Sequence, residues 1–218
     1  MKRIIMICEG ATEQAFARTN LETHFINKDI HLQAPLIKAS KGGIVKWPQL
    51  KDQIERHLKA EQGAHVTTFI DYYGIYGKNE FPGWDDANAI ADKNDRLDSI
   101  EYSMSQGIDP ELRHRFTPYL QLHEFEGLLF NDIDIFWNQI PREDLVDTEE
   151  LKKTFSDYPN PEMINNNKET SPSHRLARII RGYNKVIHGD IISEAIGLTR
   201  IRKKCPRFNA WITRLEKI

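Results

Sequence analysis

Acidic residues directly follow three short apolar segments of this chain, and their types suit metal binding. They are Glu9, Asp71, and the group His123, Glu124 and Glu126. Carboxylates that lie close together repel one another unless they are protonated or bridged by a cation, so such a group predicts a metal ion. The oxygen-rich set favours Mg²⁺ or Mn²⁺ over zinc, and no second His follows His123 at the spacing of a His-Glu-x-x-His zinc motif.

Cleavage of a phosphodiester is the chemistry that such a site would support. Mg²⁺ usually takes only one or two carboxylates together with substrate phosphates, so three or four acids suit one or two ions. Two ions about 3.5–4 Å apart stabilise the attacking and leaving oxygens of this reaction. Glu9 is alternatively a general base, and His123 is a candidate general acid/base or phosphate donor.

Each of these residues also has a simpler structural interpretation. Glu9 alone would be a solvated acid at a strand end, and a lone His such as His123 is more often a hydrogen-bonded structural residue. Glu13, one helical turn beyond Glu9, is expected to complement the helix dipole rather than to bind metal. Glu124 and Glu126 would point the same way in an extended segment, so that one binds metal while the other orients a ligand or water.

The elements that must position these acids alternate between strands and helices. The apolar patterns predict strands at residues 3–8, 35–37, 66–71 and 116–122. They predict helices from residue 13, from residue 47, over residues 84–106 and over residues 174–183. Gly189 is expected to break the helical segment that follows. Such an alternation favours a parallel sheet, and ligands bind beyond the carboxyl ends of its strands, so the acids are expected at one edge.

The length of 218 residues suits one large domain, or one domain with a small appendage. We expect an α/β domain over residues 1–135, with a mainly parallel central sheet flanked by helices. A helical, basic C-terminal part over residues 136–218 is expected to pack on the same domain. Cys8 and Cys205 are the only cysteines, so nothing points to an oxidising compartment. No stretch has the apolar length of a signal or membrane-spanning segment, and the cytosol is the expected location.

Charge is distributed unevenly along the sequence. Residues 168–218 hold 12 Lys or Arg and four Asp or Glu, a net charge of +8, so the preceding residues carry −10 against the chain total of −2. An acidic edge beside a cationic surface suits a nucleic acid, with metal at the acids and Lys or Arg along the phosphates. Arg175, Arg178 and Lys185 are the predicted phosphate-binding residues. The alternative is that these cations form solvated faces of surface helices.

Six short motifs, spread over most of the chain, carry a family resemblance. They are Cys-Glu-Gly-Ala-Thr-Glu from Cys8, Asp-Tyr-Tyr-Gly from Asp71, His-Glu-Phe-Glu from His123, Asn-Pro-Glu from Asn160, Ser-Pro-Ser-His-Arg from Ser171 and Cys-Pro-Arg-Phe from Cys205. On these motifs the chain resembles a Toprim-like domain-of-unknown-function family, family 4276, which is related to the Toprim nuclease domains of OLD-type proteins. Toprim domains place a glutamate, usually followed by glycine, after the first strand and an Asp-x-Asp after a later strand. Glu9-Gly10 and Asp71 match this pattern, whereas Tyr73 occupies the position of the second aspartate.

The resemblance implies a Toprim-like fold and a metal-dependent, nuclease-like effector that cleaves DNA or RNA. It also implies an OLD/SMC-like ATPase as partner, in a bacterial phage-defence or mobile-element system. Glu9, Asp71, and Glu124 or Glu126 would then bind the ions, with one of the last two compensating for Tyr73. The alternative function is that of a non-enzymatic Toprim-like adaptor, which binds an ATPase, nucleic acid or both, and Tyr73 favours this alternative.

Overall fold

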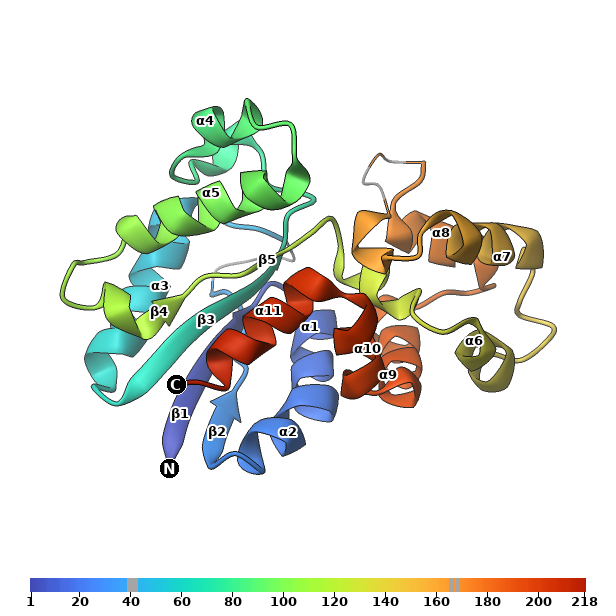
Figure 1. The fold of residues 1–218 in the computed structure, drawn as a ribbon, viewed down its shortest axis with the longest axis horizontal. Coiled ribbons are helices and arrows are strands. Elements are labelled where there is room, and N and C mark those ends of the chain that lie inside the picture. Colours follow the sequence, from blue (N-terminus) through green and yellow to red (C-terminus); the bar gives the residue numbers. More distant parts are fainter. Residues whose placement is uncertain (39–42, 165–166, 168) are drawn as a thin grey trace.

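A parallel β-sheet forms the centre of the molecule, as the sequence predicted. The structure is a computed structural model that describes residues 1–38, 43–164, 167 and 169–218. Within these residues the strands follow the order β2-β1-β3-β4, and β5 pairs with β3 beyond the end of β4 (Figure 1). All of these pairs are parallel. The strands are β1 (Lys2–Cys8), β2 (Ile30–Gln33), β3 (Ala64–Asp71), β4 (Phe116–Thr117) and β5 (Leu120–Gln121).

Helices flank the sheet and continue beyond it. Those of the first half are α1 (Ala11–Phe16), α2 (Glu22–Ile26), α3 (Trp47–Ala60), α4 (Trp84–Asn88) and α5 (Lys93–Gln106). Those of the second half are α6 (Ile133–Gln139), α7 (Thr148–Asp157), α8 (Pro172–Ile179), α9 (Lys185–Ile196), α10 (Leu198–Lys204) and α11 (Pro206–Leu215). No helix in the described part of the chain is long and apolar enough to cross a bilayer.

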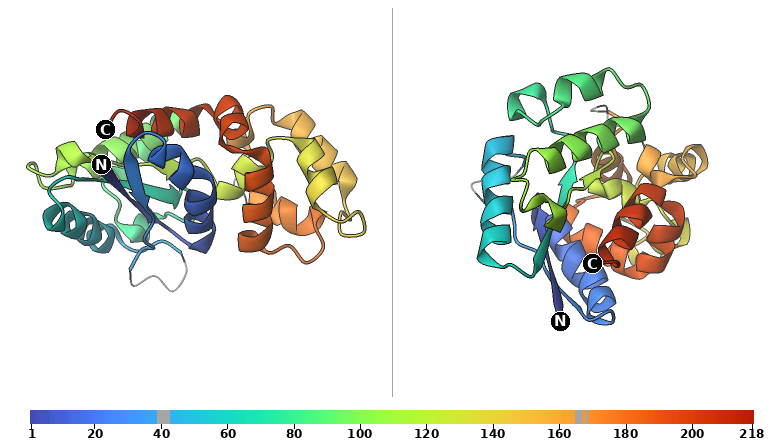
Figure 2. Two further views of the ribbon diagram at one scale, coloured as in Figure 1. Left: turned by 90° about the horizontal axis from the view of Figure 1, so that it is seen from below. Right: turned by 60° about the vertical axis from the view of Figure 1, so that its left-hand side comes forward.

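Both faces of the sheet are covered, and β1 shows this directly. Ile4 and Met6 point into one apolar core, with α1, α2 and α11, whereas Ile5 and Ile7 point into the other, with α3 and α5. The alternation follows from the two-residue repeat of a strand, and apolar residues on both faces are typical of a central parallel strand. Figure 2 shows the two helical layers from further directions.

The C-terminal helices share a core with the sheet domain. Phe136, Leu151 and Ile196 belong to the same apolar cluster as Ile4, so α6 to α9 extend that core beyond the carboxyl ends of the strands (Figure 1). The chain then returns, and α11 lies along the sheet. There the Trp211 indole N–H donates to the Thr67 hydroxyl at 2.9 Å, and its ring stacks on Tyr119 with centroids 4.1 Å apart.

Two predicted strands were wrong in their extent, and proline explains both. The second strand lies over Ile30–Gln33 rather than residues 35–37, where Leu36 makes only an isolated bridge to Cys8. The expected strand at residues 116–122 divides into β4 and β5 on either side of Pro118. Pro35 and Pro118 have no backbone N–H to donate, so the ladder of hydrogen bonds is interrupted at each.

Several helix boundaries also differ from the predicted ones. The helix expected over residues 84–106 divides because the Asp92 side chain accepts from the backbone N–H groups of Asn94 and Asp95 and caps a new helix there. The first helix begins at Ala11 rather than residue 13, with Gly10 as its N-cap. Helix α8 ends at Ile179 rather than residue 183, since the next residue forms an antiparallel bridge to Leu145.

The prediction that Gly189 breaks a helix was wrong. Gly189 lies inside α9, where α9 crosses α1. A Cβ atom at this position would stand 3.3 Å from Thr12 Cγ2 and 3.4 Å from Phe125 Cε1. The glycine therefore permits close packing of α9 against the first helix and the turn after β5, and this packing brings the C-terminal helices to the edge of the sheet where the acids lie.

Candidate active site

Glu9 and Asp71 stand at the carboxyl ends of the neighbouring parallel strands β1 and β3. The Asp71 backbone N–H donates to Glu9 Oε2 at 3.0 Å, and the Glu9 N–H donates to the Phe69 carbonyl at 3.1 Å. Both residues are only partly buried, so both keep contact with solvent. The structure therefore brings these two predicted acids together at one edge of the sheet.

The turn after β5 completes this edge. The Phe125 backbone N–H donates to Asp71 Oδ1 at 2.8 Å, which fixes the turn that carries Glu124 and Glu126 beside Asp71. This segment is a 3₁₀-helix over Phe125–Leu129 rather than an extended strand, so the expectation that the two glutamates point the same way was wrong. The bond to Asp71 and the tight turn direct their side chains to different partners.

Glu124 is bound by the start of α8. Its Oε2 accepts from the Ser173 backbone N–H and its Oε1 from the Ser173 hydroxyl, each at 2.9 Å. A carboxylate is stabilised at a helix N-terminus by the free N–H groups and the helix dipole. Glu124 thus anchors α8 to the sheet domain. Sequence reasoning missed this role of Ser173, although the residue lies in the Ser-Pro-Ser-His-Arg motif at a recognisable helix start.

Glu126 instead pairs with Lys185 at the start of α9. The Lys185 ammonium lies 2.9 Å from Glu126 Oε1, and its side chain is 54% exposed against 2% for that of Glu126. Burial opposes the charge of Lys185, but the Glu126 carboxylate raises the pKa of the lysine above its usual range. This places Lys185, a predicted phosphate-binding residue, at the acidic cluster.

Burial, and after it mutual repulsion, raises the pKa values of the clustered acids. Burial, and then the neighbouring Glu13 carboxylate, raise the pKa of Glu9 to about 8. Burial and the Glu126 charge raise the pKa of Glu13 to about 7, even though the Gly10 N–H donates to Glu13 Oε2 at 2.8 Å. Burial and then the charges of Glu13 and Glu9 raise the pKa of Asp71 well above its usual range. At neutral pH the cluster therefore takes up protons or requires a cation.

Glu13 takes the expected structural role at the helix start and is also buried. As a first-turn acid its carboxylate accepts from the helix N-cap, which is the predicted structural role. It is also buried against the other acids, and its charge raises the pKa values of both Glu9 and Asp71. The set of acids at this edge is thus Glu9, Glu13, Asp71 and Glu126, with Glu124 held by α8.

Two polar side chains at this edge, those of Tyr183 and Lys93, were not foreseen from the sequence. The Tyr183 hydroxyl is buried with no hydrogen-bond partner in the described residues, and burial, then the Glu126 and Glu124 charges, raise its pKa. On the other side, Lys93 Nζ lies 3.0 Å from Nε2 of the buried His123. Burial, and then the Lys93 charge, lower the pKa of His123 to about 3, so this imidazole is neutral near pH 7.

Arg175 and Arg178 lie on α8 and pair with Glu150 of α7. The Arg178 Nε donates to Glu150 Oε2 at 2.8 Å, and Arg175 NH1 lies 3.5 Å from Glu150 Oε1. Arg175 also donates to the Thr154 hydroxyl at 3.1 Å. These contacts join α7 to α8, and a phosphate would have to compete with Glu150 for both guanidinium groups. Their phosphate-binding role stays a prediction.

The donor set suits an open magnesium site rather than a closed cage. No three His, Cys, Asp or Glu side chains within the described ranges are grouped so as to hold one ion together. Mg²⁺ needs only one or two carboxylates, since water and phosphate supply its other ligands. Glu9 and Asp71 each accept a backbone N–H with one carboxylate oxygen. Within the described part of the chain, the second oxygen of each carboxylate shows no hydrogen bond. As a pair, Glu9 and Asp71 meet the need of such an ion for one or two carboxylates.

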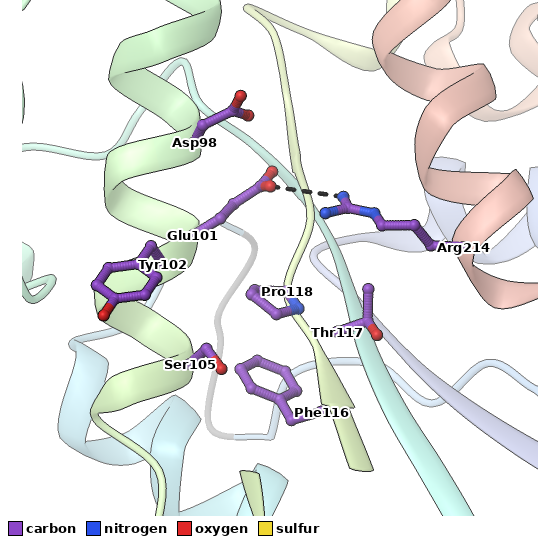
Figure 3. A pocket seen from close by; sticks show the side chains of 8 residues that line it. All are labelled: Asp98, Glu101, Tyr102, Ser105, Phe116, Thr117, Pro118 and Arg214. Carbon is purple, nitrogen blue, oxygen red and sulfur yellow. Dashed lines mark ion pairs between the residues drawn. The ribbon is translucent and has the colours of Figure 1, made fainter. Parts of the chain in front are cut away.

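A separate cavity of about 450 Å³ lies between α5, the end of β4 and α11 (Figure 3). Glu101 and Arg214 face each other across it, with their nearest polar atoms 3.6 Å apart. Phe116 of β4 and Pro118, which follows that strand, form its apolar side. None of the clustered acids lines this cavity, so it is distinct from the candidate site.

Comparison with known proteins identifies a family. A family model described as Domain of unknown function (DUF4276) matches residues 8–216, and the chain therefore belongs to this family. Neither the curated proteins nor the solved structures contain a match to the chain. The matched range includes all of the clustered acids and Lys185.

Proposed function

We propose that this DUF4276 member is a metal-dependent phosphodiesterase, a nuclease-like effector that cleaves DNA or RNA with Mg²⁺ or Mn²⁺. One observation carries the proposal: acids from the ends of two adjacent parallel strands and the following turn meet in a cluster that pairs with a single lysine. A divalent cation relieves the repulsion that raises the pKa values of Glu9 and Asp71. The same edge of an open α/β sheet is where ligands generally bind.

The side chains of the cluster divide into distinct tasks under this proposal. Glu9 and Asp71 would hold an ion, with Glu126 as the neighbouring acid, and a bound ion would neutralise charge on the phosphate and activate water. Backbone N–H groups already orient Glu9 and Asp71. Lys185 would neutralise substrate phosphate from the solvent side. In the alternative role of general base, Glu9 must be ionised, so a pKa of about 8 would make this role available mainly at pH 8 and above.

The Toprim resemblance is consistent with this arrangement. Glu9-Gly10 and Asp71 occupy the expected strand ends, and Tyr73 replaces the second aspartate. Glu126 is the acid best placed to compensate for Tyr73, because Glu124 has both oxygens bonded to Ser173. The proposal includes an OLD/SMC-like ATPase partner in a bacterial phage-defence or mobile-element system, which rests on the resemblance alone.

A non-enzymatic adaptor is the second candidate. Two observations favour it: Tyr73 offers no carboxylate, and no three described acids form a ready-made ion cage. An adaptor would bind nucleic acid, an ATPase or both, and would need the acids only for electrostatic recognition.

The test is cleavage of labelled single- and double-stranded DNA and RNA with Mg²⁺, Mn²⁺ or EDTA, in the presence and absence of a candidate OLD/SMC-like ATPase. Glu9→Gln and Asp71→Asn should each reduce cleavage by about 100-fold or more while leaving the thermal unfolding transition in place. Glu149→Gln, an exposed carboxylate on α7, is the matched control and should cleave normally.

Unchanged cleavage by Glu9→Gln would remove Glu9 from the mechanism. Absence of cleavage under all these conditions, together with retained nucleic-acid binding, would favour the adaptor.

A further inference from the structure

Lys93 and His123 form a polar pair beside the acidic cluster that the proposed chemistry does not use. Lys93 opens α5, which connects β3 to the parallel strand β4 and so starts at the carboxyl edge of the sheet. His123 directly precedes Glu124, and its carbonyl accepts from the Tyr73 N–H at 2.8 Å. The pair therefore lies at the same edge as Asp71, on the side of Tyr73.

His123 is held rigidly, and its ring is incompletely satisfied. The residue is 1% exposed and has a φ of 67°, which is uncommon for a residue other than glycine. A Lys ammonium can only donate, so Lys93 donates to His123 Nε2, and Nδ1 then carries the ring proton. Nδ1 is buried with no hydrogen-bond partner in the described residues. Strained backbone and unsatisfied polar groups of this kind are often retained at functional sites.

Lys93 is a cation without an acidic partner. No carboxylate lies within ion-pair distance of it among the residues that the structure describes, in contrast to Lys185 at Glu126. After burial, the charge of Arg96 lowers the pKa of Lys93, and the Arg96 guanidinium donates to the Ile90 carbonyl. The Asp92 cap and Asp95 already complement the dipole of this helix, but two cations three residues apart repel each other. An anion bound at Lys93 would relieve that repulsion.

We propose that Lys93 binds a backbone phosphate of a nucleic-acid strand whose neighbouring phosphodiester lies at the Glu9–Asp71 cluster, and that His123 is its positioning residue. The inference rests on the proposed function for the identity of the ligand. Lys185 pairs with Glu126 of the cluster and Lys93 contacts His123 at the same edge, so the two lysines would bind different phosphates of one strand. His123 accepts one ammonium N–H and leaves the other two for phosphate oxygens.

The test measures binding without cleavage. Fluorescence anisotropy of labelled single-stranded DNA and RNA oligonucleotides in EDTA would give affinity as a function of salt. Lys93→Ala should weaken binding about tenfold and reduce the slope of log K against log salt by about 0.7, the value for one phosphate contact on a single strand. Lys93→Arg should retain most of the affinity. Lys59→Ala is the matched control, because Lys59 lies in the last turn of α3 at the opposite edge of the sheet.

A double-mutant cycle tests the role assigned to His123. His123→Asn keeps a residue that tolerates positive φ but removes the imidazole contact. If His123 acts through Lys93, the loss of affinity caused by Lys93→Ala should shrink several-fold in the His123→Asn background, whereas a purely structural role predicts additive losses. Additive losses would overturn the positioning role.

The outcomes separate this inference from the proposed function. An unchanged affinity and salt slope for Lys93→Ala would overturn the inference even if the protein cleaves nucleic acid. If Lys93→Ala binds the oligonucleotides more weakly and with a smaller salt slope, and the protein never cleaves them, the inference would be upheld. Only the nuclease function would then be removed. Failure of the wild-type protein to bind either oligonucleotide would overturn it as well.

Discussion

Buried acids occur in two regions of this molecule, and their surroundings differ sharply. Glu101, on α5, is buried between that helix, β5 and α11. Two guanidinium groups reach it, from Arg207 and from Arg214, and the Leu120 backbone N–H donates to its Oε1 at 2.8 Å. Burial raises the pKa of Glu101, but the two arginines and this hydrogen bond all act in the opposite direction.

The cluster at the carboxyl edge of the sheet lacks this compensation. Glu9, Glu13, Asp71 and Glu126 have raised pKa values, and each is raised further by other acids of the group after burial itself. Lys185 is the one cation that forms an ion pair with them in the described part of the chain. A compensated buried acid serves stability or specificity of packing, whereas an uncompensated group of acids indicates a site for a ligand.

Removing the cation from the compensated region should have the largest effect on stability. The Arg207 side chain is 8% exposed and that of Glu101 5%, so Arg207→Ala leaves Glu101 buried with only half-exposed Arg214 as a partner. The expected loss is about 3–5 kcal/mol in the free energy of unfolding, measured by urea denaturation. Arg214→Ala, the control, should cost no more than about 1 kcal/mol. Equal losses for the two variants would contradict the view that Arg207 is the main compensating charge.

Divalent cations should stabilise the uncompensated region in a pH-dependent manner. Glu9 and Glu13 have pKa values of about 8 and 7 in the folded protein against an ordinary value of 4.5. The folded state therefore binds more protons than the unfolded state between about pH 4.5 and 8, and stability from these groups, fully present below pH 4.5, is lost as the pH rises to 8.

Thermal unfolding in EDTA and in Mg²⁺ or Mn²⁺ at pH 5.5 and 8 measures this effect. At a metal concentration 100 times the Kd the expected stabilisation is about 2.7 kcal/mol, or about 5–10 °C in Tm for a chain of this size. The shift should be larger at pH 8 and smaller in Glu9→Gln. A shift of the same size at both pH values in both proteins would mean that the metal binds elsewhere.

The sequence predicted the sheet and the position of its acids because both follow from local patterns. Apolar runs marked β1 and β3, and the parallel arrangement then placed Glu9 and Asp71 at one edge. The proline interruptions at Pro35 and Pro118 were also visible in the sequence, and their missing N–H groups were the signal to apply.

The partners of each acid were beyond sequence reasoning because they come from distant segments. Ser173 meets Glu124 from 49 residues away, and Lys185 reaches Glu126 only because α9 packs closely over Gly189. A glycine at a helix crossing has the same local sequence signature as a helix breaker. Similarly, the 3₁₀-turn at Phe125 depends on its bond to Asp71 and not on local propensity.

Lys185→Ala and Arg178→Ala test whether a cation at the acidic cluster differs from one outside it. Lys185 and Arg178 both pair with a carboxylate and have half-exposed side chains, but Glu126 belongs to the cluster and Glu150 does not touch it. Lys185→Ala should reduce cleavage or oligonucleotide binding about tenfold, because it removes the cation at the acids. Arg178→Ala should change either quantity by less than about twofold and stability by no more than about 1 kcal/mol.

Parallel cleavage and binding assays of the two variants with the same oligonucleotide measure this difference. An equal loss in Arg178→Ala would mean that the α8 arginines bind phosphate despite Glu150, and that the ligand-binding surface extends beyond the uncompensated cluster.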